Sequence, residues 1–579
     1  MKRHIPKQRT YSVRAADMPG CLNIHIYSNV VVGLEMVNKM SQQGAGISRT
    51  VFTAALIVML LVGVAGGYLG RMMTVPAGET QTIRITGMTT TVGASSNQVV
   101  IGVTDKITDL DPANVWGVFT QEVLTNTMEG LLKYIPGTTD LELGIARSYT
   151  VEDNGNVYIF KLKPNLRFAD GTLADANNVA WSIKRVMKIS ADAAYLVTDY
   201  VKDVQALDNE TVKFTLKAPA SYFPSVVATA EYFTVHPSYN PDKIDSDQTA
   251  GGLGEYHITT WQRDVQLVLD ANPDYYNGAP KLQRIIIKFY STASAMRLAL
   301  ESGEIDIAWR TLTPSDVRDL RNNPALQVQD VPGAYIRYII INENIPPFDN
   351  KLVRQAIAAA ADRNAICDKI FYDTVHPLYS MIPMGMWGHT DAFKDKYGEY
   401  NLDLARSLLK QAGYSETNKL TFDMWYTPSH YGDTEADVAL QVKESLESTG
   451  MMSVNLKSAE WATYLDQTKA GLYPVSLYGW YPDYLDPDNY QSSWIDTGWI
   501  GHSYKNPVVS SLIANASIAQ TVQERIALYA QSQAIWADDS AIIPLFQGGI
   551  QAAYKTTVTG VVLDPVMVLH YWLIYYKRM

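Results

Sequence analysis

The chain has 579 residues, of which 47% are hydrophobic and 18% are charged, the composition of a folded protein with about two to four domains. Its formal net charge of −11 argues against nucleic-acid binding, which requires clustered Lys and Arg side chains. The two cysteines, Cys21 and Cys367, support neither a disulfide framework nor a Cys-based metal site. The sequence has no His pair at helical spacing, no Gly-rich phosphate loop and no nucleophile elbow, so we predict no metal, no cofactor and no catalytic residue.

One run near the N-terminus is apolar and long enough to cross a membrane, at residues 50–70. It contains no charged residue and exceeds the apolar region of a typical cleaved signal peptide. We therefore interpret it as a retained transmembrane anchor in preference to a signal. Residues 1–49 have no periodicity and include alternative start methionines, Met36 and Met40, which leaves open whether this segment belongs to the true protein.

A stretch rich in Thr, Ser and Gly follows at residues 71–98. This composition is typical of a linker that holds a folded body away from the membrane. Basic residues are denser before the apolar run than just after it, which predicts that the body lies outside the cell. The protein is therefore expected at the cell surface, anchored to the cell membrane.

The body begins near Val99 and alternates between strand and helix patterns, which indicates an α/β fold. Strands are expected at 99–103, 158–164, 212–216, 265–269, 285–289, 338–342, 542–546 and 561–563. Helices are expected at 119–132, 175–187, 294–300, 351–361, 402–412, 435–449 and 522–536. The apolar C-terminal residues 569–576 are too few to span a membrane and are expected in the core.

The segment 478–490 holds five aromatic rings, three carboxylates and two prolines in thirteen residues. Because Pro removes backbone donors and Asp and Asn favour turns, we expect a stiff loop here. Such a loop presents flat apolar faces beside negative charge, as needed to bind a polar organic solute. The alternative is a solvated turn between core strands.

Nine short motifs occur in the same order as in one known family. The chain resembles the family 5 extracellular solute-binding proteins of ABC importers, the oligopeptide- and dipeptide-binding type. The motifs are Leu110-Asp111-Pro112, Glu129-Gly130-Leu131, Phe160-Lys161-Leu162-Lys163-Pro164 with Phe168-Ala169-Asp170-Gly171-Thr172, Asn272-Pro273-Asp274-Tyr275-Tyr276-Asn277-Gly278, Gly303-Glu304-Ile305-Asp306, Pro347-Phe348-Asp349 with Val353-Arg354-Gln355-Ala356-Ile357, Asp362-Arg363, Ala412-Gly413-Tyr414, and Gly479-Trp480 with Asp483-Tyr484.

The resemblance implies a two-lobed periplasmic-binding-protein fold of type II with an extra subdomain, which closes on its ligand by a hinge. Lobe I is expected to comprise residues 99–130, 235–334 and 535–579. The extra subdomain would comprise residues 131–234, and lobe II residues 335–534.

The resemblance also implies a set of ligand-binding residues. In peptide-binding members, the Trp and Asp of the Gly-Trp-x-x-Asp segment line the cleft, and the Asp holds the α-ammonium group. These positions are Trp480 and Asp483 here, and we expect Tyr484 beside them. Trp116 follows the Leu110-Asp111-Pro112 turn and is expected to face the cleft from lobe I, unless it is an ordinary core indole.

Two features depart from the peptide-binding pattern. An oligopeptide binder can carry an acidic residue at the position of Trp116, and some peptide binders place an Arg just before the Trp corresponding to Trp480. Because stacked aromatic faces suit sugar rings and relatives of this fold bind oligosaccharides, an oligosaccharide ligand is the alternative to an oligopeptide. In either case, the resemblance implies the membrane subunits of an ABC permease as partners.

Two further readings are kept open. A glycosidase would use paired carboxylates such as Asp483 and Asp486, but neither has a neighbour in sequence that would raise its pKa. We expect Asp486 and Asp488 to cap the turn instead. A surface sensor with the same fold is the other reading, although the sequence carries no signalling domain. Binding without catalysis is the function that we predict.

Overall fold

The computed structural model describes residues 97–494 and 504–577. The predicted N-terminal segment, the predicted anchor and nearly all of the predicted linker lie outside these ranges. Within them, no helix is both long and apolar enough to cross a bilayer. The described part of the chain is thus the predicted body.

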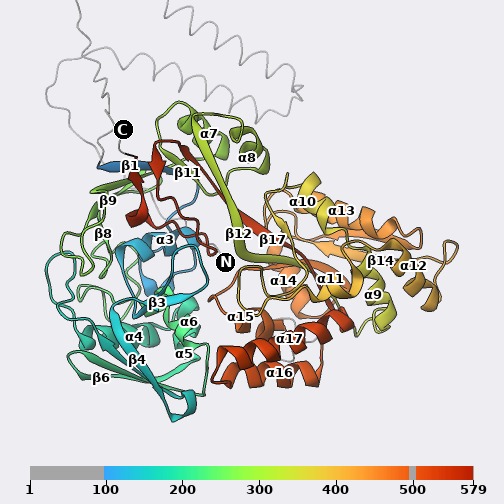
Figure 1. The fold of residues 1–579 in the computed structure, drawn as a ribbon, viewed down its shortest axis with the longest axis horizontal. Coiled ribbons are helices and arrows are strands. Elements are labelled where there is room, and N and C mark those ends of the chain that lie inside the picture. The colour runs from blue at the N-terminus through green and yellow to red at the C-terminus, as the bar shows by residue number, and fades with distance from the viewer. Residues whose placement is uncertain (1–96, 495–503, 578–579) are drawn as a thin grey trace, which may run out of the picture. The chain divides into compact units, whose positions relative to one another are not determined.

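A mixed sheet of eleven strands runs through the body (Figure 1). Its strands lie in the order β15-β14-β16-β12-β17-β11-β1-β10-β9-β8, and β13 pairs with β17. The two longest, β12 (Leu326–Ile341) and β17 (Ile542–Lys555), are antiparallel neighbours in the middle of this order. Their pairing shifts register between Pro332 and Ile336. These two strands connect the part of the sheet that we call lobe I with the part that we call lobe II.

Lobe I is built on the β8 side of the sheet, where β1 pairs in parallel with both β10 and β11. The apolar strand residues are buried as expected from their pattern, for example Val99 and Ile285. The elements of this lobe are β1 (Gln98–Val103), α3 (Val118–Thr127), β8 (Tyr256–Gln262), β9 (Gln266–Ala271), β10 (Arg284–Phe289), α7 (Ala293–Glu301), β11 (Ile307–Trp309), α8 (Pro314–Leu320), β18 (Val558–Thr559) and β19 (Tyr575–Tyr576). The short helix η4 (Ala230–Tyr232), within the predicted bounds of the extra subdomain, contacts α3 of this lobe.

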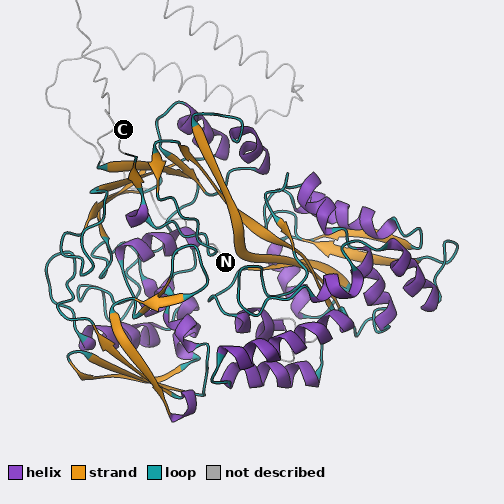
Figure 2. Ribbon diagram, viewed as in Figure 1, coloured by secondary structure: helices purple, strands orange, loops and turns teal. Residues whose placement is uncertain are grey.

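Lobe II is built on the β15 side, where helices flank the parallel strands β14 and β15 (Figure 2). The predicted helix at 402–412 ends as expected, because Gly413 takes the left-handed conformation (φ 93°) that follows a helix C-terminus. The elements are α9 (Lys351–Ala360), α10 (Arg363–Lys369), β13 (His376–Pro377), α11 (Ala392–Tyr397), α12 (Leu402–Gln411), β14 (Leu420–Tyr426), α13 (Glu435–Glu447), β15 (Met452–Ser458), α14 (Trp461–Lys469), β16 (Val475–Trp480), α15 (Pro487–Gln491), α16 (Pro507–Ile518) and α17 (Val522–Asp539).

A separate four-stranded antiparallel sheet, in the order β4-β5-β7-β6, forms the core of the extra subdomain. Its helix α4 begins at Ala176 because Asp175 and Asn178 form a reciprocal capping box. The elements are β2 (Leu132–Tyr134), β3 (Leu141–Leu143), β4 (Ala146–Glu152), β5 (Val157–Leu162), α4 (Ala176–Ile189), α5 (Tyr195–Thr198), β6 (Val201–Asp208), β7 (Thr211–Leu216) and α6 (Phe223–Val227). The exact boundaries between this subdomain and the two lobes stay a prediction.

The segment 478–490 is not a loop throughout, contrary to the prediction. Its first residues finish β16, where Trp480 is the register partner of Ile336 in β12. Its last residues begin α15, with Pro487 in the first turn. Backbone N–H groups in the first turn have no acceptor within the helix, so Pro, which lacks the N–H, is tolerated there. Only residues 481–486 connect strand and helix. The aromatic residues that suggested a binding loop include strand residues that pack inside the sheet.

The helix expected at 119–132 also ends earlier, at Thr127. The Thr127 carbonyl accepts hydrogen bonds from the backbone N–H groups of Gly252 (3.1 Å) and Gly254 (3.3 Å), so a tertiary contact replaces the next helical turn. Met128 is extended, and Leu132 belongs to β2. Glu129 and Gly130 are thereby released from the helix.

Near the C-terminus, the strand expected at 561–563 is only an isolated bridge between Leu563 and Leu569. The strand β18 ends at Thr559, because Gly560 takes a left-handed conformation (φ 76°). The expectation that residues 569–576 belong to the core is confirmed for Leu569, Tyr571 and Ile574, which are fully buried, but not for Tyr575, which is 37% exposed.

Family motifs at the lobe junctions serve the scaffold. Asp111 caps a short helix and is buried against Arg185 of α4, with two hydrogen bonds of 2.7 and 2.5 Å. This pair joins lobe I to the extra subdomain.

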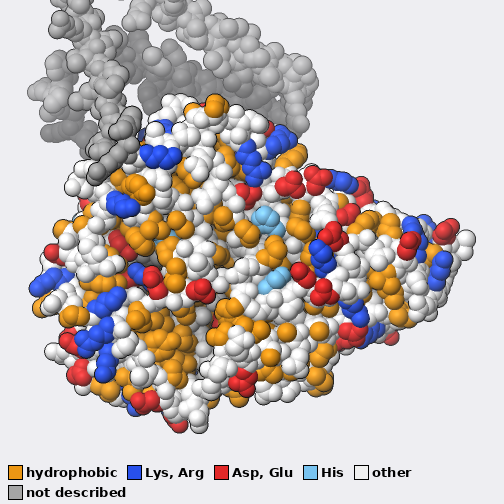
Figure 3. All heavy atoms as spheres, viewed as in Figure 1, with side chains coloured by type: hydrophobic (Ala, Val, Ile, Leu, Met, Phe, Trp, Pro, Cys, Tyr) orange, Lys and Arg blue, Asp and Glu red, His pale blue; other side chains and the backbone are white. Residues whose placement is uncertain are grey.

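At the surface, acidic and basic side chains are interspersed on the face that Figure 3 shows. That face carries no extended field of one sign.

Candidate ligand-binding site

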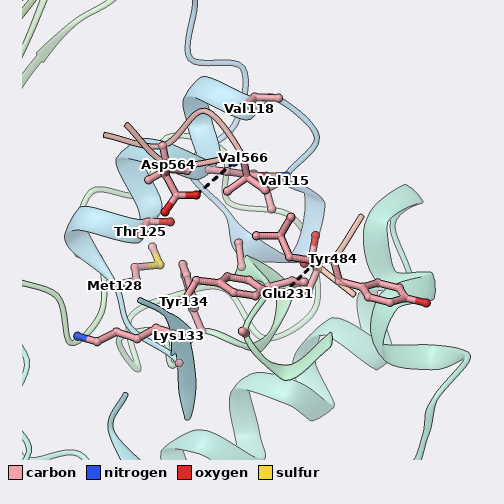
Figure 4. A pocket seen from close by; sticks show the side chains of 18 of the residues that line it. Val115, Val118, Thr125, Met128, Lys133, Tyr134, Glu231, Tyr484, Asp564 and Val566 are labelled. Atoms are coloured by element: carbon pink, nitrogen blue, oxygen red, sulfur yellow. Dashed lines mark hydrogen bonds between the residues drawn. The ribbon is translucent and has the colours of Figure 1, made fainter. Parts of the chain in front are cut away.

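A cavity of about 350 Å³ lies where lobe I, the extra subdomain and the loop 481–485 of lobe II meet (Figure 4). Its walls also include residues 228–233 around η4 and the C-terminal segment 564–572. Cavities that hold small ligands measure about 300–1,000 Å³ and are mostly apolar with a few polar groups. The cavity is therefore large enough for a small organic solute.

The loop 481–486 is held rigidly at its far end. Asp486 caps α15 by accepting from the Asp488 N–H (2.9 Å), which confirms the expected capping role. The Asp486 carboxylate also binds Arg525 of α17 through two hydrogen bonds of 2.6 and 3.0 Å, and both side chains are buried. The Leu485 N–H donates to the Tyr134 hydroxyl across the cavity wall (2.9 Å). The loop is thus fixed by contacts on two sides.

Asp483 lines the cavity. Asn489 Nδ2 lies 3.4 Å from its carboxylate, and the Asp483 N–H donates to Asn489 Oδ1 (3.1 Å). Burial raises the pKa of this carboxyl, and the Tyr195 hydroxyl and Asn489 oppose the shift. Among the described residues, no Lys, Arg or His forms an ion pair with Asp483.

Glu231 in η4 lines the same cavity and is only 2% exposed. Burial raises its pKa to about 7, a shift to which the negative charge of Asp483 adds. Within the described ranges, no basic side chain pairs with Glu231. A buried and a half-buried carboxylate therefore line one cavity without a basic partner among the described residues, the arrangement expected of a site for a cationic ligand.

Sequence reasoning missed Glu231. It sits in the sequence Thr-Ala-Glu-Tyr-Phe, which matches no motif and has no periodic signal. Only the packing of η4 against the loop that carries Asp483 brings the two acids to one cavity. The sequence alone held no indication of that contact.

The three aromatic residues predicted for the site take different positions. Trp116 lines the cavity, is 53% exposed and has its ring 6.1 Å from that of Tyr195. Tyr484 also lines the cavity, but its ring stacks on Tyr222 of the extra subdomain (5.5 Å, 4°) and its hydroxyl donates to Asp488 (3.1 Å). In Figure 4 the Tyr484 hydroxyl points away from the other labelled residues.

Trp480 is not among the residues that line the cavity. Its indole N–H donates to Asn489 Oδ1 (2.9 Å), the same atom that accepts from the Asp483 N–H. The structure therefore places Trp480 behind Asp483, where it orients Asn489. Its expected role in contacting the ligand directly stays a prediction.

A second polar group lines the cavity where α3 has ended. Glu129 accepts hydrogen bonds from the hydroxyls of Tyr275 (3.0 Å) and Tyr276 (2.8 Å) and forms an ion pair with Lys133 (2.9 Å). Glu255, 5% exposed, lies beside them, and burial together with the charge of Glu129 raises its pKa. The Glu129-Gly130-Leu131 motif thus contributes to the cavity wall. No cluster suited to a metal ion occurs among the described residues.

The family model for bacterial extracellular solute-binding proteins, family 5, matches residues 140–502. The chain belongs to this family. The resemblance seen in the nine motifs is therefore confirmed, and the matched residues include both the extra subdomain and the loop that carries Asp483.

Relatives of this solute-binding protein cover most of its body. It is 29% identical over 445 residues to the probable D,D-dipeptide-binding periplasmic protein DdpA of Escherichia coli, covering 74% of this chain and 84% of that protein. It is 27% identical over 480 residues to the periplasmic oligopeptide-binding protein OppA of Salmonella typhimurium, covering 76% and 85%. These relatives are named as binding proteins and not as enzymes.

Solved structures show the fold. HbpA2 from Haemophilus parasuis matches with a TM-score of 0.75 at 23% identity, covering 83% of this chain and all of that one. DppA from Helicobacter pylori, solved with the peptide STSA, matches with a TM-score of 0.66 at 24% identity, covering 83% and 98%. The solute-binding protein thus has the mixed α/β fold of periplasmic binding proteins, as expected.

Proposed function

We propose that this protein captures short peptides outside the cell and delivers them to an ABC permease. Family membership and the names of relatives that bind dipeptides and oligopeptides support this function. The observation that carries it is the pair Asp483 and Glu231, a half-buried and a buried carboxylate that line a ligand-sized cavity without a basic partner among the described residues.

A peptide's α-ammonium group supplies what this pair lacks. Burial disfavours both charges, which raises both pKa values. An ammonium group placed between them would form charge-assisted hydrogen bonds in a poorly solvated site, where such bonds are strongest. We assign the main contact to Asp483, in line with the family motif, and a second contact to Glu231.

The aromatic and apolar walls would receive the rest of the peptide. Trp116 leaves half of its indole exposed beside Tyr195, which favours stacking on a ligand side chain over a role in the core. Tyr484 would act differently, because its stack on Tyr222 links lobe II to the extra subdomain. It is suited to stabilising the arrangement of the lobes around the ligand.

We also propose that the body is tethered to the outer side of the cell membrane by residues 50–70. The support is the uncharged apolar run followed by the linker at 71–98. Protease treatment of intact cells tests this: the body should be digested, while a fragment containing residues 50–70 should stay in the membrane fraction. Release of the intact body by washing would contradict it.

Ligand capture can be tested with the full-length protein in detergent. Titration with Ala-Ala-Ala is expected to change Trp fluorescence and raise the melting temperature, because binding only the folded state stabilises it. N-acetylated Ala-Ala-Ala should bind about tenfold more weakly or worse, since it lacks the ammonium group. Maltotriose is the comparison ligand. Binding of maltotriose without binding of any peptide would replace the proposed ligand class by oligosaccharides.

A further inference from the structure

The charge of the cavity wall goes beyond what one ammonium group requires. Glu231 and Asp483 account for one acidic region, but four more carboxylates line the cavity. Its basic lining residues are Lys133 and His570, and the His570 ring lies 3.0 Å from Asp564. The acidic lining residues are Glu129, Glu142, Glu231, Glu255, Asp483 and Asp564.

Lys133 is not available to a ligand's carboxylate. It is already paired with Glu129 at 2.9 Å, and its ammonium lies 5.8 Å from the centre of the Trp572 ring. Burial opposes its charge, but the attraction of Glu129, Glu255 and Glu142 outweighs that effect and raises the pKa of Lys133. Three carboxyl groups therefore act on one ammonium group, and only Glu129 is within ion-pair distance of it.

Glu255 and Glu142 have no ion-pair partner among the described residues, and of the two Glu255 is the buried one. It is 5% exposed, and no Lys, Arg or His of the described residues lies within ion-pair distance of its carboxylate. Glu129, in contrast, is satisfied by Lys133 and two tyrosine hydroxyls. A buried acid that faces a cavity beside a second acid is suited to a cationic group of the ligand.

The two acidic regions are separate. Figure 4 shows Lys133 toward one side of the pocket and Glu231 toward the other, with Tyr134 between them. Glu231 and Asp483 come from η4 and the loop of lobe II, whereas Glu129 and Glu255 flank α3 and β8 of lobe I. One cation cannot serve both regions, so a ligand that satisfies both must carry two.

Building on the proposed function, we propose that the preferred ligand is a short peptide with two cationic groups. Its α-ammonium group binds at Asp483 and Glu231, and a Lys or Arg side chain near its amino terminus binds at Glu255 beside Glu129 and Glu142. The peptide's carboxyl end points out of the cavity, because the basic residues of the lining are already engaged by Glu129 and Asp564. A free diamine shares the chemistry and is separated from a peptide by the experiment below.

Calorimetric titration of the full-length protein with charge-graded tripeptides tests this inference. Lys-Ala-Ala and Ala-Lys-Ala are compared with Ala-Ala-Ala, Glu-Ala-Ala and 1,5-diaminopentane at the same pH. The better of the two Lys peptides should bind at least about tenfold more tightly than Ala-Ala-Ala, and Glu-Ala-Ala should bind most weakly. This preference should shrink as salt is raised from 0.05 to about 0.5 M.

The variant Glu255→Gln isolates the second region. It should remove most of the preference for Lys peptides, measured as the ratio of their affinity to that for Ala-Ala-Ala, and a cooperative melting transition without ligand shows that the variant is folded. Glu444→Gln, an exposed change on α13 of lobe II, is the matched control and should keep the full preference. A preference that survives in Glu255→Gln would overturn the assignment of this residue.

The outcomes separate the two proposals. If Ala-Ala-Ala binds and the Lys peptides bind no better, the dicationic ligand is wrong while peptide capture stands. If no tripeptide binds and only the diamine does, peptide capture is wrong and the charge argument applies to a diamine. If Glu-Ala-Ala binds best, the proposed direction of the charge preference is refuted.

Discussion

Asp486 and Asp483 lie three residues apart in one loop, yet the fold treats them differently. Asp486 is buried against Arg525, which binds it through two hydrogen bonds. Asp483 is half-buried and has no basic partner among the described residues, although burial raises the pKa of Asp486 as well as that of Asp483. The comparison teaches that the presence of a basic partner, more than a raised pKa, separates a scaffold carboxylate from a binding carboxylate.

The largest effect is expected from breaking the scaffold pair. Asp486→Ala leaves the Arg525 guanidinium buried without its counter-charge, and removing one partner of a buried pair costs about 3–5 kcal/mol. The free energy of unfolding from urea titration should fall by that amount. Asp466→Ala, at an exposed helix position, should change it by less than about 0.5 kcal/mol. An equal, small effect of both variants would show that Arg525 does not depend on Asp486.

A second expected effect concerns pH and Glu231. The pKa of Glu231 in the folded protein is raised to about 7, above the ordinary 4.5 of the unfolded chain. Because the folded state holds this proton more tightly than the unfolded state, the contribution of Glu231 to the free energy of unfolding is fully present below pH 4.5. This contribution is lost as the pH rises through 7.

Relative to Glu231→Gln, which cannot ionise, the wild-type protein should therefore lose on the order of 3 kcal/mol of unfolding free energy between pH 4.5 and 8. Urea midpoints of both proteins, measured at several pH values in this range without ligand, provide the check. Parallel curves for the two proteins would mean that Glu231 ionises normally.

Asp483→Asn should separate stability from binding. The change removes a half-buried charge that has no basic partner among the described residues, so the unfolding free energy should stay within about 1 kcal/mol of wild type. Affinity for Ala-Ala-Ala should fall about 10- to 100-fold, since a hydrogen bond to a charged group contributes about 1.5–3 kcal/mol. Asp466→Asn serves as the control. Loss of stability like that of Asp486→Ala, with binding intact, would reverse the roles of the two acids.

The smallest expected effect belongs to Trp480. Trp480→Phe removes the N–H that bonds Asn489 but keeps an aromatic ring, so affinity should fall only about threefold and stability by about 1 kcal/mol. Trp461→Phe, whose ring stacks on His430 in lobe II, is the control for the lost fluorescence signal. A loss of affinity above about 30-fold would show that Trp480 contacts the ligand directly.

The sequence predicted the fold well because the motifs that carry it are local. Asp175 and Gly413, for example, determine helix ends through capping and a left-handed turn, which need no distant partner. The resemblance to the family, carried by the Gly-Trp-x-x-Asp segment, also implied a role for Asp483. In these cases the physical cause lies within a few residues of its effect.

The remainder of the site depends on contacts that sequence spacing does not encode. Glu231 and Glu255 reach the cavity only because η4 and the start of β8 pack near the end of α3. Thr127 ends its helix because two glycines from a distant segment bond its carbonyl. The aromatic residues, prolines and carboxylates around Trp480 predict a loop, whereas in the structure its backbone is paired with β12.

The ribbon formed by β12 and β17 bears on how the two lobes can move. Its pairing is interrupted between Pro332 and Ile336, and opposite this interruption Gly548 lies so close to Tyr335 that a Cβ atom would be only 1.7 Å from the ring. Rotation of one lobe against the other would twist both strands at once, with the irregular pairing as the most compliant point. A bulkier residue at 548 would therefore push against the Tyr335 ring and change the pairing of the two strands. It would alter how readily the lobes move while leaving both acidic regions intact.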